Sequence, residues 1–217
     1  MAQQNKSNSL TEGSVARGML LFAIPIFISN LFQQLYNAAD SLIVGNFLGG
    51  EALAAVGSSG SLIFLLTGFV NGVALGAGEL IARYFGAKDY DEMKTSVYTS
   101  LIGSAVLCAV LMGIGLFGCD ALLELINTPE EILADSSLYL DIYVWGLPFV
   151  FFYNIATGVF SALGDSKTPF IFLAASSLSN IAVDILFVTA FKMGVAGVAW
   201  ATFLCQGISC VLAVAVV

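Results

Sequence analysis

Histidine is absent from this 217-residue sequence, and charged side chains make up only 10% of it. Soluble domains usually carry about 25% charged residues. Together with 59% hydrophobic residues and a mean hydropathy of +0.94, this scarcity indicates an integral membrane protein. Because histidine is a frequent metal ligand and acid–base catalyst, and because no G-x-S-x-G nucleophile motif is present, we expect no enzyme.

Basic residues are scarce as well, with seven Lys and Arg against 15 Asp and Glu and a net charge of −8. Binding of nucleic acid requires a basic patch, so that class of function is excluded. The cysteines lack the spacing of metal ligands, and we interpret them as small packing residues and expect no cofactor. They are Cys108, Cys119, Cys205 and Cys210.

The apolar runs are longer than the roughly 20 residues that a helix needs to cross a membrane. Because lipid offers the backbone no hydrogen bonds, such runs form helices. The sequence therefore predicts an all-α membrane protein, with a cytoplasmic segment at 1–17 and a six-transmembrane-helix bundle at 18–217. The predicted spans are 18–46, 54–82, 94–118, 136–161, 169–191 and 194–217. A short interfacial helix capped by Thr128 is expected within 119–135.

Lysine and arginine concentrate on one side of this bundle, which marks the cytoplasmic side. The opposite side holds Lys192 and the acidic residues of 119–135. We therefore expect a multi-pass protein of the cell inner (plasma) membrane with its N-terminus in the cytoplasm. The residues on the basic side are Lys6, Arg17, Arg83, Lys88, Lys94 and Lys167.

Proline and glycine interrupt two of the predicted spans. Pro25 removes a helix hydrogen bond and should bend the first span, either as a hinge or as a static kink. Gly72, Gly76 and Gly78 follow a small-residue spacing in the second span. Such residues allow close packing of helices, so we expect this face to contact a neighbour.

The stretch "FISNLFQQLYNAADSLIVG", residues 27–45, carries a carboxylate and four amides inside the first span. At about 100° per residue, its polar side chains share one face of the helix. A polar face cannot point at lipid, so it lines a cavity or packs against other polar groups. The stripe comprises Asn30, Gln33, Gln34, Asn37, Asp40 and Ser41.

Later spans supply partners for Asp40 at the same depth. Asn180 and Asp184 lie four residues apart in the fifth span, and Thr202 lies in the sixth. Counted from the predicted helix ends, Asp40, Asp184 and Thr202 lie about 9–12 Å below the outer surface. Two confined carboxylates do not easily both stay charged, so the site suits exchange of H⁺ or binding of Na⁺ by oxygen ligands. Simple hydrogen bonding between helices is the alternative.

Four further stretches follow one another along the chain: "LFQQLYNAADSLIVGNFLGGEALAAVG", "IARYFGAKD", "ALGDSKTPF" and "LSNIAVDILFVTAFKMGVAGVAWATFLCQ". In this order they resemble the multidrug and toxic compound extrusion (MATE) family. The resemblance implies one lobe, the first, of a twelve-helix exporter whose two six-helix lobes are related by a pseudo-twofold axis. It also implies a cation-coupled antiporter that exports organic cations or amphipathic drugs against H⁺ or Na⁺.

The resemblance assigns ion coupling to Asp40, Asn180, Asp184 and Thr202, which become metal ligands if the ion is Na⁺. The implied partners are membrane lipid, a small organic cation and a second six-helix lobe. The alternatives are a lipid-linked oligosaccharide flippase of the same superfamily and a non-transporting fragment or scaffold. The expected wall of the substrate cavity comprises Gln34, Tyr36 and Asn154.

Overall fold

Six long helices and one π-helical turn make up the computed structural model, which describes residues 15–216 apart from the side chains of 15–18, 21, 22 and 25. No strand occurs in this described part, and the all-α prediction is confirmed. Most of the predicted cytoplasmic segment 1–17 lies outside it. The elements are α1 (Val15–Phe47), α2 (Gly50–Gly86), α3 (Tyr90–Leu125), α4 (Glu130–Ala162), α5 (Lys167–Ile185), η1 (Leu186–Ala190) and α6 (Val195–Val216).

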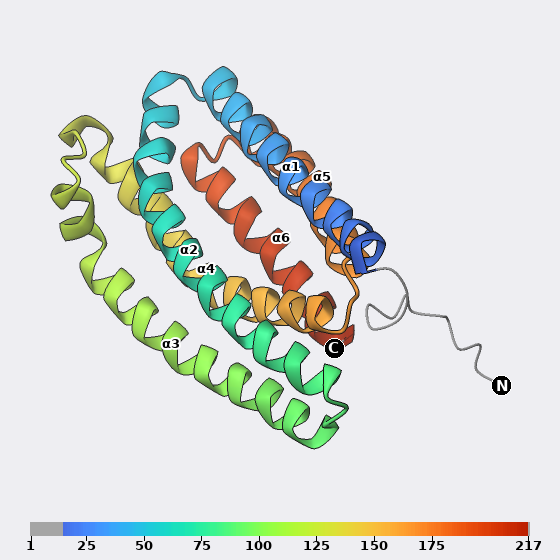
Figure 1. The fold of residues 1–217 in the computed structure, drawn as a ribbon. Coiled ribbons are helices and arrows are strands. Elements are labelled where there is room, and N and C mark those ends of the chain that lie inside the picture. Colours follow the sequence, from blue (N-terminus) through green and yellow to red (C-terminus); the bar gives the residue numbers. More distant parts are fainter. Residues whose placement is uncertain (1–14, 217) are drawn as a thin grey trace.

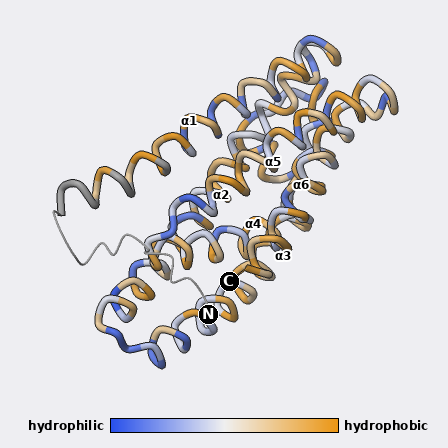
Figure 2. The backbone as a smooth tube through the Cα atoms, turned by 90° about the vertical axis from the view of Figure 1, so that its right-hand side faces the viewer, coloured by the Kyte–Doolittle hydropathy of each residue, from blue (hydrophilic) through white to orange (hydrophobic). Residues whose placement is uncertain are grey.

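The helices suit a membrane. Over the described residues, α2, α3, α4, α5 with η1, and α6 are each long and apolar enough to cross one. Large apolar side chains face outward along them, including Phe64 and Phe117, which are 80% and 95% exposed. Figure 2 shows hydrophilic stretches gathered at the ends of the bundle, whereas hydrophobic ones run along the helices. The helices and their apolar outer surface are those of a multi-pass membrane protein.

The prediction of a short interfacial helix within 119–135 is wrong. Helix α3 continues to Leu125 and α4 begins at Glu130, so these acidic residues extend two long helices beyond the apolar spans. Thr128 does not cap a helix, because its hydroxyl pairs with that of Ser58 on α2 at 2.8 Å. Asn127, in the left-handed region at φ 58°, reverses the chain.

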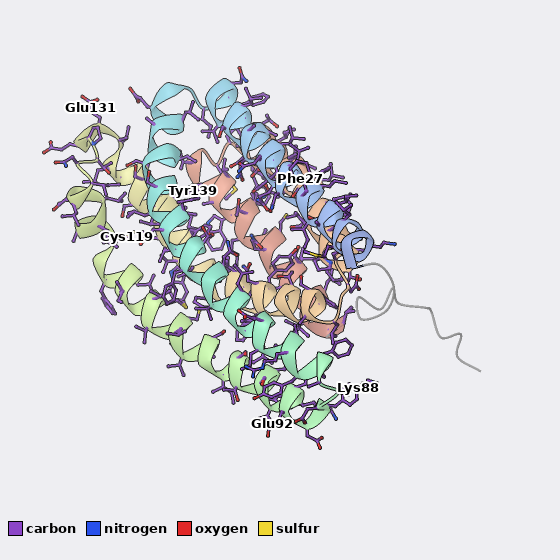
Figure 3. All side chains as sticks on the ribbon, viewed as in Figure 1. Phe27, Lys88, Glu92, Cys119, Glu131 and Tyr139 are labelled. Atoms are coloured by element: carbon purple, nitrogen blue, oxygen red, sulfur yellow. The ribbon has the colours of Figure 1, made fainter. Side chains whose placement is uncertain are left out.

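Helices α2 and α4 form the centre of the bundle, with α3 on one flank and the pair of α1 and α5 on the other (Figure 1). Apolar residues that are almost fully buried, including Val70, Leu147 and Phe151, join α2, α3 and α4. The loop after α2, with Lys88, lies at the end of the bundle opposite to Glu131 (Figure 3). Each long helix thus runs from one end of the bundle to the other.

Buried hydroxyl groups fasten α2 to α4 near the start of α4. Ser59 donates to the backbone carbonyl of Ser136 at 2.8 Å, and Ser136 donates to that of Ala55 at 3.2 Å. Ser59 and Ser136 are both 0% exposed. Inside a low-dielectric interior such bonds are strong and fix the relative position of the two helices.

A glycine pair brings the same two helices together near the other end. A Cβ on Gly78 would lie 3.2 Å from the carbonyl oxygen of Gly158, and one on Gly158 would lie 3.0 Å from that of Ala74. The predicted contact is therefore correct for Gly78 but wrong for Gly72 and Gly76, where an added Cβ meets nothing within 4 Å. The spacing pattern identified the helix but not which of its faces has a neighbour.

Asp165 caps the start of α5 within the "ALGDSKTPF" stretch. Its Oδ1 accepts hydrogen bonds from the backbone amides of Lys167 and Thr168 at 3.0 and 3.1 Å, and its Oδ2 accepts one from the Thr168 hydroxyl. Partial burial raises the pKa of Asp165, but these hydrogen bonds outweigh it and hold the pKa below its usual value. The charged carboxylate is therefore the form that stabilises this turn.

Replacing Gly158 with alanine should lower the free energy of unfolding by about 1–3 kcal/mol, because the new methyl group overpacks the crossing of α2 and α4. The measurement is thermal unfolding of the purified protein in detergent. Gly72→Ala is the matched control and should unfold at or slightly above the wild-type temperature. Equal losses in the two variants would contradict the close approach at Gly158.

Replacing Asp165 with alanine should cost about 1 kcal/mol of stability at neutral pH. Because the folded-state pKa of Asp165 is lowered, its contribution is present above the usual Asp pKa of about 3.9 and is lost as the pH falls through the folded-state value. Melting curves of wild type and Asp165→Ala should therefore converge in acid. A gap that stays constant or widens on acidification would refute this account; Asp165→Asn, which keeps an acceptor oxygen, serves as the control.

Candidate functional site

A cavity of about 690 Å³ lies between α1, α2, α4, α5 and α6. Its walls are rich in amides and hydroxyls, and among the described lining residues there is no lysine or arginine. Asp40 is the carboxylate among them. The amide side chains that line it are Asn30, Gln33, Gln34, Asn37, Asn71, Asn154, Asn180 and Gln206. A polar cavity therefore lies between helices whose outer surfaces are apolar.

Helix α1 supplies the polar stripe that the sequence predicted, and all six of its residues line the cavity. They do so because α1 is helical throughout, so positions three and four apart stay on one face. Helical structure also continues through position 25, but the side chain of Pro25 lies outside the described residues. Its role as a hinge stays a prediction.

The carboxyl groups of Asp40 on α1 and Asp184 on α5 lie within hydrogen-bonding reach of each other. Asp184 is 0% exposed, and Asp40 is partly buried. Within the part of the chain that the structure describes, the Oδ1 atoms of both groups are buried and have no hydrogen-bond donor. Two buried acceptors without a donor, on carboxyl groups that interact with each other, are chemically matched to a proton or a small cation.

Asn180 connects this pair to two further helices. With its amide in the orientation that satisfies both ends, Nδ2 donates to Oδ2 of Asp184 and to the hydroxyl of Tyr36, each at 2.9 Å. Its Oδ1 accepts from the backbone amide of Thr202 on α6 at 3.1 Å. Asn180 is 2% exposed, so this network is almost dry. One amide thus couples α1, α5 and α6.

The structure brings Asp40, Asn180, Asp184 and Thr202 together at one edge of the cavity. The position of Asp184 behind Asn180, rather than on the cavity wall itself, did not follow from the spacing. The side chains predicted for the substrate wall all line the cavity, and Asn154 donates to the carbonyl of Val150 on its own helix at 2.7 Å. Those side chains are Gln34, Tyr36 and Asn154.

Sequence reasoning missed the tyrosines that α4 contributes. Tyr139 is 6% exposed, lies in the interior of the bundle (Figure 3) and interacts electrostatically with both carboxyl groups. Tyr143 follows one turn later and also lines the cavity. Their four-residue spacing was visible, but aromatic residues in apolar spans usually pack in the core and carry no distinct signal. Cys205, interpreted as packing, places its thiol beside Asn180.

A family model described as MatE matches residues 25–186. The chain belongs to the MatE family. The resemblance to this family noted in the sequence is thereby confirmed, together with a fold that corresponds to one lobe of its transporters. The matched region includes α1 with its polar stripe and the α5 residues Asn180 and Asp184.

Two relatives of this MatE protein come from Bacillus subtilis (strain 168). The "Probable multidrug resistance protein YpnP" is 33% identical over 204 residues, which cover 94% of this chain and 46% of the relative. The "Probable multidrug resistance protein YoeA" is 38% identical over 193 residues, which cover 87% and 42%. The chain therefore spans about half the length of the curated relatives it matches.

A solved structure shows the same correspondence in three dimensions. It is described as the outward-facing conformation of a multidrug resistance MATE family transporter of the MOP superfamily. The alignment covers 98% of this chain and 47% of that one, with 26% identity and a TM-score of 0.90. The six-helix bundle is thus equivalent to about half of that transporter.

Replacing Asn180 with alanine should destabilise the protein by about 1–3 kcal/mol, because it leaves Asp184, Tyr36 and the Thr202 amide without their buried partner. Asn154→Ala removes a cavity amide that bonds only within its own helix, so it should unfold close to wild type. Thermal unfolding of the three proteins in detergent measures the difference. Equal stability of Asn180→Ala and Asn154→Ala would contradict the network.

Proposed function

We propose that this chain is one lobe of an ion-coupled multidrug exporter of the plasma membrane, with its N-terminus in the cytoplasm. In this proposal the pair Asp40 and Asp184 exchanges H⁺ or Na⁺ for an organic cation. The observation that carries the proposal is the direct juxtaposition of these two acids, from α1 and α5, at the edge of a polar cavity.

The chemistry of the pair supports cation exchange. Two carboxylates in contact within a low-dielectric bundle repel each other, and a bound cation relieves that repulsion. An organic cation in the cavity competes for the same negative charge. Binding of the ion therefore weakens binding of the substrate, which is the differential affinity that antiport requires.

The orientation of Asn180 bears on which ion is used. In the orientation that satisfies both ends of its amide, Nδ2 donates to Asp184 and the oxygen accepts from the backbone amide of Thr202. In that arrangement Asn180 donates a hydrogen bond to a carboxyl group, and its amide oxygen does not face the carboxyl pair where a metal ion would bind. Binding of Na⁺ through Asp40, Asp184, Thr202 and Asn180 fits the oxygen donors that this ion prefers, but it requires the Asn180 amide to turn over.

The attachment of α1 to the rest of the bundle supports a route from ion binding to substrate release. Apart from its packing along α5, α1 is connected to the bundle mainly through the outer cluster around Val44 and the Asn180 network at Tyr36. Neutralising the carboxyl pair changes that network, and Pro25 offers a place for α1 to bend. Tyr36, which is held by Asn180, can present its ring to a flat organic cation.

The second lobe of this transporter is also part of the proposal. The curated relatives are about twice as long, and alternating access in such transporters takes place between two halves. In a cavity formed between two lobes, residues of both lobes would line the walls. The absence of lysine and arginine from the described lining argues against an anionic lipid-linked oligosaccharide as the cargo.

Efflux of a fluorescent organic cation from proteoliposomes tests this function. With the complete transporter, an imposed H⁺ or Na⁺ gradient should drive efflux, and Asp40→Asn should reduce the driven rate by at least about tenfold, since transport then lacks its charged partner. Asp141→Asn is the matched control, because Asp141 lies outside the cavity beside Cys119. Undiminished driven efflux in Asp40→Asn would refute the proposal, and no efflux by the wild type would favour a non-transporting role.

A further inference from the structure

The two ends of the Asn180 amide have different surroundings. In the orientation that satisfies both ends, Nδ2 donates to Asp184 and Tyr36, so both of its N–H groups are used. The oxygen accepts from the backbone amide of Thr202 and keeps a second lone pair. The thiol of Cys205 lies within hydrogen-bonding reach of the same amide, and only the oxygen end has capacity for it. That end of Asn180 therefore faces two groups of α6.

The fold holds the sulfur of Cys205 at this place. Cys205 follows Thr202 by three residues on α6, so the two side chains share one face of that helix. The side chain of Cys205 is 6% exposed and lies at the cavity wall. The hydroxyl of Ser176, one turn before Asn180 on α5, donates to the backbone carbonyl of Cys205 at 3.5 Å. The thiol is thus a fixed neighbour of the amide.

Buried oxygen atoms of the coupling site accept no hydrogen bond. Among the described residues, Oδ1 of Asp40, Oδ1 of Asp184 and Oγ1 of Thr202 are buried and have no donor. They come from α1, α5 and α6, and oxygen donors of this kind suit a hard cation such as Na⁺. The amide oxygen of Asn180 would add a further ligand, but it is directed at α6 instead.

Turning the Asn180 amide over would direct its oxygen at the carboxyl pair. Nδ2 would then lie against the backbone amide of Thr202, which is itself a donor and accepts nothing. A buried N–H group without an acceptor is costly and rare in folded proteins, whereas a carbonyl oxygen with one lone pair unused is tolerated better. The sulfur of Cys205 lies at this end of the amide, and a thiol both donates and accepts weak hydrogen bonds.

We propose that Cys205 is a positioning residue of the ion site. Its sulfur accepts a hydrogen bond from Nδ2 of Asn180 in the turned-over form, and this allows the amide oxygen to join the carboxyl pair and the Thr202 hydroxyl around Na⁺. The inference rests on the proposed ion-coupled function, within which it assigns a determinant of Na⁺ binding. Cys205 does not bind the ion itself and acts through Asn180.

Thermal unfolding of the complete transporter in detergent tests this role without any transport step. A ligand that binds the folded state raises the melting temperature, so the rise with Na⁺ concentration, with K⁺ replacing Na⁺ at constant ionic strength, reports binding. Cys205→Ala should need at least about fivefold more Na⁺ than wild type for the same rise, because Nδ2 then lacks an acceptor. Cys205→Val, which also lacks one but fills the space, should behave in the same way.

Two variants that keep the chemistry serve as controls. Cys205→Ser retains an acceptor and should respond to Na⁺ like wild type. Cys210→Ala removes a sulfur that is equally buried on α6 but lies outside the lining of the cavity, and it should also respond like wild type.

Three results would overturn the inference and leave H⁺-coupled export intact. The first is a wild-type response to Na⁺ in Cys205→Ala and Cys205→Val. The second is an equal loss in Cys205→Ser, which would mark a packing role of the sulfur. The third is a wild-type protein that Na⁺ stabilises no more than K⁺ does. Failure of the proposed function is a separate observation, since it appears as the absence of efflux under both H⁺ and Na⁺ gradients.

Discussion

Two carboxyl groups in contact inside an apolar bundle are the constraint on which the rest of this structure depends. Uncompensated charges are costly in such surroundings, so the bundle must supply hydrogen-bond donors or a polar environment. It does so with Asn180, which donates to Asp184 and Tyr36, and with the polar stripe of α1, which opens the pair to a cavity. These polar groups interrupt otherwise apolar spans because the acids require them.

The remainder of the bundle divides into a central part, α2 and α4, and helix α1, which is joined to it by packing along α5, by the cluster around Val44 and by this network. Helices α2 and α4 are locked at one end by Ser59 and Ser136 and at the other by Gly78 and Gly158. These contacts resist sliding of α2 along α4. The glycine contact leaves no room for an added atom, and breaking the serine hydrogen bonds would leave buried polar groups unpaired. Helix α1 is joined to α5 and α6 through Asn180 instead. The carboxyl pair therefore lies where α1 meets α5.

Helical periodicity and depth were enough to predict the all-α bundle and to place Asp40, Asn180, Asp184 and Thr202 at one level. Both follow from the fixed rise and turn of a helix and from the exclusion of polar groups from lipid. The residues whose contacts were predicted wrongly are those whose environment depends on the tertiary structure. Thr128 has the sequence of a helix cap but pairs with α2, and Gly72 has a packing spacing but faces no neighbouring atom.

Other structural features have no recognisable pattern in the amino-acid sequence. The turn η1 occupies an apolar stretch, LFVTA, that is equally compatible with a regular α-helix. It packs closely against the start of α6 at Gly197, a tertiary contact that no local propensity encodes. In the sequence Tyr139 is typical of an ordinary core aromatic residue, and only the fold brings it close enough to interact with the carboxyl pair. Sequence thus predicts which chemistry is present more readily than the contacts that orient it.

The most direct measurement of the central claim is proton release on binding of an organic cation, recorded with a pH indicator in weakly buffered, Na⁺-free detergent solution at equilibrium, where H⁺ is the ion that can occupy the site. If Asp40 and Asp184 form one exchangeable cation site, the wild-type protein releases protons when the organic cation binds, and Asp184→Asn releases fewer or none. Equal proton release by the two proteins would contradict the account, because exchange would then take place elsewhere in the molecule.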